Sequence, residues 1–262
     1  NIYPKYYLKA FYDGMTAEGD TMPISLIRSA WAGSAKYGAL VWSGDIVSTF
    51  ECFRRQVQAG LNMAVAGIPW WTTDIGGFHG ARTDDPDFHR LYIRWFEYGC
   101  FCPVMRLHGN RNPQEGYGAE QIGSGSDNEI WSFGDKAYEI SKKYIFLRER
   151  LRDYIRTQMK KAHEDGTPMM RPVFYDFPTD QESWNVEDAY LFGPDLYVAP
   201  VMEDHVTERE VYLPDGTAWF NAWTGEKYEG GQNVTVAAPM DIIPVFVREG
   251  ADTEHLLNIF SE

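Results

Sequence analysis

Three groups of polar and aromatic residues follow short apolar runs and could carry chemistry. They span residues 40–45, 70–78 and 105–110, and the first ends in Asp45 behind a glycine. Barrel enzymes place catalytic groups at the carboxyl ends of parallel strands, so an acid at such a position is a candidate for acid–base chemistry. One carboxylate does not make an enzyme, because Asp45 could equally cap a helix that begins near Thr49.

The elements that must position these groups alternate between short apolar runs and longer helical patterns from about residue 25 to 157. This alternation predicts βα units that feed a parallel sheet. We expect strands at 39–42, 63–70 and 104–107, and helices at 49–61, 87–101 and 128–154. In the first helix Phe53, Val57 and Leu61 share one face. In the second, Asp87 could act as the cap.

Only about three such units are visible, which is too few to close an eight-stranded barrel. We therefore predict an α/β part, the C-terminal part of a (β/α)8 TIM barrel, over residues 1–166. After residues 166–168 the pattern changes to short β-rich runs separated by Gly, Pro and Asp turns. Six strands are expected, at 169–177, 189–201, 208–213, 218–223, 233–237 and 243–247. They predict an antiparallel β-sandwich over residues 167–262, with a short helix or a frayed end after Gly250.

Composition excludes several classes of function. The net charge of −14 opposes binding to nucleic acid, which needs clustered Lys and Arg. No run of eighteen apolar residues occurs, so no membrane span is predicted. Three cysteines and six scattered histidines predict no disulfide framework, no metal site and no cofactor. The 15% aromatic content suits sugar stacking as well as core packing, which is the commoner use. The compartment stays open, with the cytoplasm slightly favoured.

Four ordered motifs resemble glycoside hydrolase family 31. They are Arg28-Ser29-Ala30-Trp31-Ala32-Gly33-Ser34, Trp42-Ser43-Gly44-Asp45, Pro69-Trp70-Trp71-Thr72-Thr73-Asp74-Ile75-Gly76-Gly77-Phe78 and Met105-Arg106-Leu107-His108-Gly109. The likeness continues through 170–172, 190–195, 198–200 and 243–248, so it covers nearly the whole chain. It implies a retaining, exo-acting α-glycosidase, chiefly an α-glucosidase or α-xylosidase, that acts on oligosaccharides or small glycosides without a cofactor.

The resemblance implies roles for three polar residues. Asp45 falls on the general acid/base, which must protonate the departing oxygen and later deprotonate the attacking water. Arg28 matches an arginine that binds sugar hydroxyls, a task that suits its rigid fork of donors. His108 matches a sugar-hydroxyl ligand, since imidazole can donate from one nitrogen and accept at the other. The alternatives are a solvated arginine at a strand end and a histidine satisfied within the core.

Further residues of these motifs are expected around the same pocket. Trp42 would supply an apolar wall beside Asp45, and Trp71 and Phe78 are expected as pocket walls or as core. Asp74 lies on a loop that lines the pocket in relatives, and it either contacts the sugar or supports it through hydrogen bonds from behind. Arg106 is expected to be a structural ion-pair partner.

Retaining hydrolysis needs two carboxyl groups about 5 to 5.5 Å apart. The resemblance places the nucleophile upstream of Asn1, and nothing before Arg28 matches it. We therefore expect the upstream barrel segment of a parent protein as a partner, and we expect this chain alone to lack ordinary hydrolase activity.

The sequence supports more than one substrate and more than one class of function. Residues 42–50 look closer to α-xylosidases, with an α-glucosidase nearly as well supported. The alternative from another class is a non-catalytic carbohydrate-binding or vestigial relative, against which the retained Asp45, Arg28 and His108 count. The sequence leaves the oligomeric state open.

Overall fold

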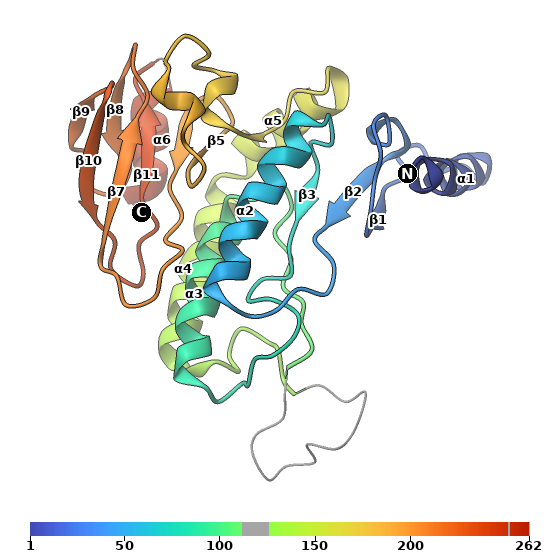
Figure 1. Cartoon of the computed structure of the whole chain (residues 1–262), viewed down its shortest axis with the longest axis horizontal. Coiled ribbons are helices and arrows are strands. Elements are labelled where there is room, and N and C mark those ends of the chain that lie inside the picture. Colours follow the sequence, from blue (N-terminus) through green and yellow to red (C-terminus); the bar gives the residue numbers. More distant parts are fainter. Residues whose placement is uncertain (112–125, 251, 262) are drawn as a thin grey trace.

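The structure, a computed structural model, describes residues 1–111, 126–250 and 252–261. Along its longest axis the molecule runs from helix α1 (Tyr3–Ala17), through a short parallel sheet and helices α2 to α5, to a group of antiparallel strands (Figure 1). The chain thus forms βα units first and antiparallel strands second, in the predicted order. Among the described residues, no helix combines the length and the apolar character that crossing a bilayer requires.

The parallel sheet consists of β1 (Ser25–Ile27), β2 (Ala39–Trp42) and β3 (Trp71–Thr72), with β2 in the middle. In its register Val41 lies opposite both Ile27 and Trp71. Because side chains alternate along a strand, Val41 and Trp71 point to the same face of the sheet. The strand at 39–42 has the predicted bounds.

Helix α2 (Phe50–Val65) follows β2 and begins at the cap Thr49, whose hydroxyl accepts a hydrogen bond from the Cys52 amide at 3.1 Å. The predicted apolar face is confirmed, because Phe53, Val57 and Leu61 are all buried. Phe53 also stacks on Trp95 of α3, with 4.9 Å between the ring centroids. This contact joins two helices that cover the same face of the sheet.

The prediction of a strand at 63–70 is wrong. Helix α2 continues to Val65, and the chain turns at Gly67, whose φ is +75°. The Ile68 amide then donates to the carbonyl of Met63 at 2.9 Å, which closes a Schellman-type end. The apolar run 63–70 therefore forms the last turn of α2 and the segment that leads into β3.

Two further helical predictions need correction. Helix α3 (Pro86–Cys100) is capped by Asp85, whose carboxylate accepts from the Asp87 amide at 2.8 Å, so Asp87 lies in the first turn and is not the cap. The single helix expected at 128–154 is two helices, α4 (Gly134–Arg150) and α5 (Arg152–Glu164), which join at Leu151.

The predicted strand at 104–107 is not a regular strand. Its residues lie beside β3, with hydrogen bonds from Val104 N to Trp71 O (3.2 Å) and from Ile75 N to Arg106 O (3.3 Å). Residues 104–107 therefore lie where a fourth strand would pair with β3, but among the described residues they form only these two backbone hydrogen bonds and no continuous ladder.

The antiparallel part forms a six-stranded sheet and a two-stranded sheet. The larger sheet has the order β4 (Met170–Arg171), β5 (Tyr190–Phe192), β6 (Leu196–Val198), β11 (Val245–Arg248), β8 (Ala218–Asn221) and β9 (Lys227–Glu229). The smaller sheet pairs β7 (Glu208–Leu213) with β10 (Gln232–Ala237). Helix α6 (Thr253–Ser261) follows, as the short helix expected after Gly250.

Among the described residues this part has eight strands, β4 to β11, where six were expected, and several of the expected bounds differ. Strand β9 was not predicted, because its Lys and Glu residues alternate with one Tyr and read as a polar turn. The run 169–177 holds only β4 and then a 3₁₀ turn at Val173–Tyr175. The run 189–201 is a hairpin, β5 and β6, that turns at Gly193 with φ +70°.

Arg94 fixes a sandwich loop to the helical layer. Its buried guanidinium donates to the backbone carbonyls of Ala238 (2.7 Å), Pro239 (3.0 Å) and Ile242 (3.1 Å). It also pairs with the buried carboxylate of Glu97 at 3.2 Å. Burial raises the pKa of Glu97 to about 8, although Arg94 acts in the opposite direction.

The raised pKa of Glu97 makes the free energy of unfolding depend on pH. Because the pKa of Glu97 is higher in the folded chain, its contribution to the free energy of unfolding is fully present below its ordinary pKa of 4.5 and is lost as the pH rises through about 8. Glu97→Gln does not titrate. We therefore expect the stability of the wild type relative to this variant to fall by about 2 kcal/mol between about pH 6 and pH 8.

Urea unfolding of both proteins at the two pH values measures this difference. Glu254→Gln, an exposed carboxylate on α6, serves as the control and should follow the wild type at both. A difference between wild type and Glu97→Gln that does not change with pH would contradict the prediction.

Candidate active site

The carboxyl ends of β1 and β2 bring Arg28 and Asp45 together. Parallel strands end at the same edge of a sheet, and the two residues follow these strands closely. Gly44 turns the chain with a φ of +80°, and the Arg28 Nη2 atom lies 2.8 Å from Asp45 Oδ2. Both side chains stay accessible, with exposed fractions of 60% and 42%. The pair therefore offers a carboxylate and a guanidinium to a bound ligand.

Trp42 lies between two arginines at this edge. The guanidinium carbons of Arg28 and Arg106 lie 5.7 Å and 5.9 Å from its ring centre. Cation–π attraction at this range helps to hold both side chains in place. Trp42 is half-buried, and Arg28 lies over its ring while it also pairs with the Asp45 carboxylate.

Asp74 lies behind this surface with no exposed area. One of its oxygens forms an ion pair with Arg106, and Oδ2 has no hydrogen-bond partner among the described residues. Burial raises the pKa of Asp74, while the charges of Arg106 and His108 lower it and that of Asp45 raises it further. The predicted structural role of Arg106 is confirmed by this pair.

The loop after Asp74 is held in a form that only glycine adopts easily. Gly76 and Gly77 have φ values of +84° and +78°. A Cβ atom on Gly77 would lie 2.7 Å from the Cα atom of Ser48, so the loop packs directly on the segment after Asp45. The amide of Phe78 donates to the carbonyl of Ile46 at 2.7 Å across the same contact.

Phe78 and His108 complete the accessible surface. Their rings lie 5.4 Å apart at an angle of 35°, with Phe78 half-buried and His108 exposed. The site therefore combines an acid, a guanidinium, an imidazole and two aromatic side chains, which is a set suited to a sugar ring and its hydroxyls.

Trp71 lies apart from the other candidates. It is 3% exposed and belongs to the hydrophobic core, on the face of the sheet that α2 covers. A Cβ atom on Gly60 of α2 would lie 2.7 Å from its indole ring. Register decides this orientation, because Trp71 pairs with the core residue Val41 while Thr72 pairs with Trp42.

Sequence reasoning missed Arg111. Its buried guanidinium donates to the carbonyls of Gly77 (2.6 Å) and Ile75 (3.0 Å), and burial lowers its pKa to about 10. It thus fixes the glycine loop from behind. Its place directly after the polar group at 105–110 was the one available signal. Two of its partners are backbone carbonyls, which no side-chain pattern reveals, and the third is the Asn128 side-chain oxygen at 2.7 Å.

Within the described ranges, no cluster of three or more His, Cys, Asp or Glu residues has the arrangement of a metal site. Two sequence models match the chain, the glycosyl hydrolases family 31 TIM-barrel domain over residues 1–158 and the family 31 C-terminal domain over residues 166–251.

The chain belongs to glycosyl hydrolase family 31. It contains the C-terminal part of the family 31 TIM barrel, followed by the C-terminal sandwich domain, and so the predicted family and fold class are confirmed.

Relatives and solved structures agree with this assignment. An α-xylosidase of Saccharolobus solfataricus is 38% identical over 251 residues, which are 96% of this chain and 32% of that protein. A solved α-xylosidase from a soil metagenome, in complex with xylose, is 53% identical with a TM-score of 0.91, and the match covers 98% of this chain and 39% of that one. A solved xylosidase from Aspergillus niger is 35% identical with a TM-score of 0.88, over 100% and 39% of the two chains. This chain thus spans about a third of the length of these family members.

The two arginine–aspartate pairs of the site should differ in their effect on stability. Arg106→Met would leave the charge of Asp74 buried without its partner, so we expect a loss of about 3 kcal/mol in the free energy of unfolding. Adding Asp74→Asn should recover most of that loss. Arg28→Met is the matched control, because its pair is exposed and should contribute less than about 1 kcal/mol.

Urea unfolding of the four proteins measures these values. Equal losses for Arg106→Met and Arg28→Met, or no recovery in the double variant, would mean that the Asp74 charge is not what Arg106 compensates.

Proposed function

We propose that the protein to which this chain belongs is a retaining, exo-acting α-glycoside hydrolase, with Asp45 as the general acid/base. The observation that supports this most is the exposed Arg28–Asp45 ion pair at the carboxyl edge of the sheet. Asp45 would give a proton to the glycosidic oxygen as the first bond breaks. The resulting carboxylate would then take a proton from the water that releases the sugar.

Arg28 would hold the Asp45 carboxylate in the free site and would bind sugar hydroxyls when substrate enters. A guanidinium presents parallel donors, so one side chain can serve both partners in turn. Phe78 and Trp42 would form walls of the pocket, and His108 would bond a hydroxyl from its exposed position. Trp71 has no part in this proposal because it is buried in the core.

Asp74 would act as a positioning residue. Its side chain has no exposed surface and is paired with Arg106, so it supports the site from behind and does not contact the sugar. For the same reason it is a poor candidate for the nucleophile, which must reach the anomeric carbon. We therefore keep the nucleophile outside this chain, upstream of Asn1.

For the substrate we propose a terminal α-xylosyl group, with an α-glucosyl group as the second candidate. Proteins named α-xylosidase are among the relatives, and one solved structure holds xylose. A relative from Bacillus thermoamyloliquefaciens named α-glucosidase 2 is 33% identical. The two sugars differ by one hydroxymethyl group, which a pocket discriminates by about 1 to 3 kcal/mol.

The acid/base role is tested best in a chimera in which this chain replaces the matching part of the soil-metagenome α-xylosidase. We expect Asp45→Asn to lower kcat by about 10²- to 10⁴-fold on an α-xyloside with a poor leaving group. The loss should shrink when the leaving group is a good one, because that group needs no proton. Added azide, which needs no deprotonation, should restore turnover. Asp13→Asn, an exposed carboxylate on α1, is the control.

An equal loss on good and poor leaving groups, without azide rescue, would assign Asp45 a structural role. Saturable sugar binding by a chimera that never turns over would favour the alternative, a carbohydrate-binding or vestigial relative. The ratio of kcat/KM for aryl α-xyloside and aryl α-glucoside decides between the two substrates.

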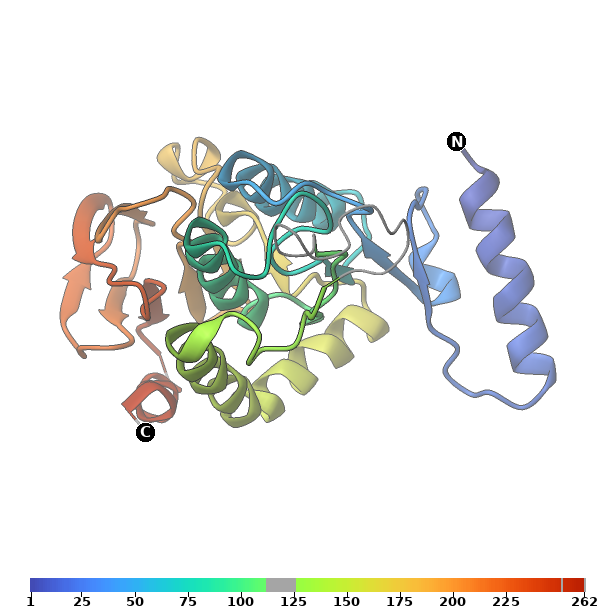
Figure 2. The same ribbon diagram turned by 90° about the horizontal axis from the view of Figure 1, so that it is seen from below.

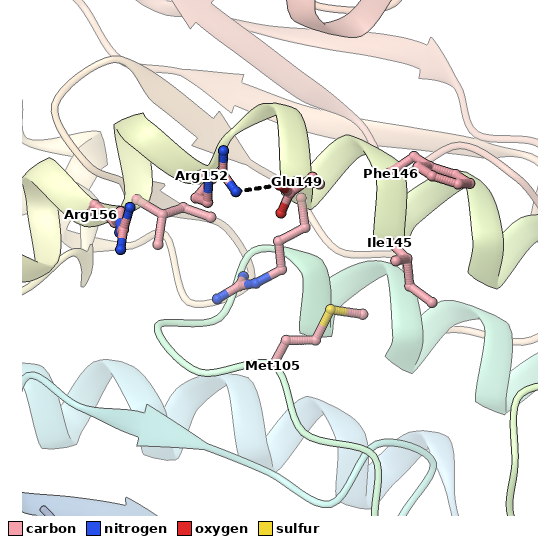
Figure 3. A pocket seen from close by; sticks show the side chains of 8 residues that line it. Met105, Ile145, Phe146, Glu149, Arg152 and Arg156 are labelled. Carbon is pink, nitrogen blue, oxygen red and sulfur yellow. Dashed lines mark ion pairs between the residues drawn. The ribbon is translucent and has the colours of Figure 1, made fainter.

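We also propose that an upstream barrel segment packs against residues 1–166, which would form part of the catalytic barrel beside a sandwich domain at 167–262. An apolar groove of about 410 Å³ lies between Met105 and helices α4 and α5. Figure 3 shows Met105 on one side of this groove and Ile145 and Phe146 on the other, with an ion pair of Glu149 and Arg152 between the helices.

The other end of the sheet has a second exposed apolar surface. Figure 2 shows α1 standing apart from the rest of the molecule, beyond β1. Its aromatic residues Tyr3, Tyr6, Tyr7 and Phe11 are between 51% and 72% exposed. Exposed apolar patches of this kind mark interaction sites. Groove and helix lie at opposite ends of the sheet, where further strands and helices of a closed barrel would pack.

Substitution of Phe146 tests whether the upstream barrel segment packs in the groove. It is 55% exposed, so Phe146→Glu should change the stability of the isolated chain by less than about 0.5 kcal/mol. In co-expression with the N-terminal two thirds of the soil-metagenome α-xylosidase, we expect the variant to lower co-purification by about tenfold. Trp131→Glu, an exposed aromatic outside the groove, is the control. Equal co-purification of the Phe146 variant and the wild type would refute the docking role of the groove.

A further inference from the structure

A second pocket lies far from Asp45, at the C-terminal end of α2. Its volume is about 350 Å³, within the range of small-molecule sites. Both ribbon views place the gold segment that contains the 3₁₀ turns Val173–Tyr175 and Glu182–Trp184 beside this helix (Figures 1 and 2). The side chains that matter for its chemistry are Gln58, Asn62, Phe174, Trp184 and Glu187.

Trp184 presents a flat apolar surface to solvent. Its ring stacks on Phe174 with 4.5 Å between centroids and 6° between planes, so one face of the indole is covered. The side chain is nevertheless 54% exposed, which leaves the other face accessible. An exposed tryptophan that is supported from behind by a second ring is a platform on which another flat, partly apolar ring can stack.

The platform is held in place before any ligand arrives. The indole Nε1 donates to the carbonyl of Pro178 at 3.1 Å. The neighbouring Ser183 is buried, and its hydroxyl lies 2.7 Å from both the Phe177 and the Asp180 carbonyl oxygens. A ligand would therefore bind without first ordering this turn, which lowers the entropic cost of binding.

Polar groups beside the platform fit hydroxyls and not an anion. Gln58 Nε2 donates to Glu187 Oε2 at 3.1 Å, which leaves further acceptor oxygens on both residues. The amide of Asn62 is exposed and makes no side-chain hydrogen bond to the described residues, so it can both donate and accept. Among the residues that the structure describes, no Lys or Arg lines the pocket, and the chain carries a net charge of −14, so a phosphate or carboxylate ligand would be disfavoured.

We propose that this pocket is a second carbohydrate-binding site, which takes a neutral oligosaccharide or polysaccharide with one sugar ring stacked on Trp184. Gln58, Asn62 and Glu187 bond its hydroxyls. The ligand class rests on the proposed function, but the site is separate from the catalytic one. Helix α2 starts near Asp45 and ends at the pocket, and its 16 residues span about 24 Å. Binding here would keep the protein on a polymeric substrate between catalytic events.

Affinity electrophoresis of the chain in gels that contain dextran, soluble starch or a xylosylated β-glucan tests the site. We expect at least one of these neutral polymers to retard the wild type, and polygalacturonate to have no effect beyond the gel blank. Trp184→Ala should weaken binding by about tenfold or more, and Trp184→Tyr, which keeps a flat ring, should retain most of it. Trp131→Ala, which removes a 68% exposed tryptophan elsewhere, is the matched control.

Two further readouts keep the result interpretable. Asp45→Asn should bind the polymer as the wild type does, so a failure of the catalytic proposal would leave this binding unchanged. Circular dichroism should show the same thermal midpoint for Trp184→Ala and Trp184→Tyr. The proposal is overturned if no polymer retards the wild type, if Trp184→Ala binds as tightly as Trp131→Ala, or if Trp184→Ala alters only the oligomeric state, which would make the platform a protein contact.

Discussion

The parallel pairing of β1 with β2 is the constraint on which the candidate site depends. It makes both strands end at one edge of the sheet, so the residues that follow them meet although they lie far apart in the sequence. Arg28 and Asp45 then form an ion pair without any long loop. The positive φ of Gly44 turns the chain at this point. A shift in register by one residue would move every side chain of a strand to the opposite face and would remove this site.

Behind this exposed pair lies a buried polar layer that sets its shape. Asp74 and Arg106 form its centre, and Arg111 holds the glycine loop through backbone carbonyls. A charge in a buried position is costly unless it is paired, so breaking these contacts would carry a free-energy cost. The accessible residues, Phe78 and His108, rest on this fixed layer. The site thus rests on paired and hydrogen-bonded groups and is open to solvent above them.

Much of this arrangement could be predicted from local patterns. The strand at 39–42 and the apolar face of α2 follow from burial on one side, and the four ordered motifs identified the family. The strand expected at 63–70 failed because Ala64 and Val65 fit a helix as well as a strand, and Gly67 was the stop signal that mattered. The face to which Trp71 points depends on strand register, which is a property of two segments and not of one.

The way in which Arg94 joins the two halves has a consequence for how the protein moves. Its guanidinium reaches carbonyls of the sandwich loop at 238–242, and Arg90 of the same helix binds Asp204 through two atoms. The sandwich is thus attached through α3, far along the chain from the covalent connection between α5 and β4. A hinge motion between the halves would have to break these hydrogen bonds first. Barrel part and sandwich should therefore tumble and unfold as one cooperative body, even with extra residues inserted in the connecting segment.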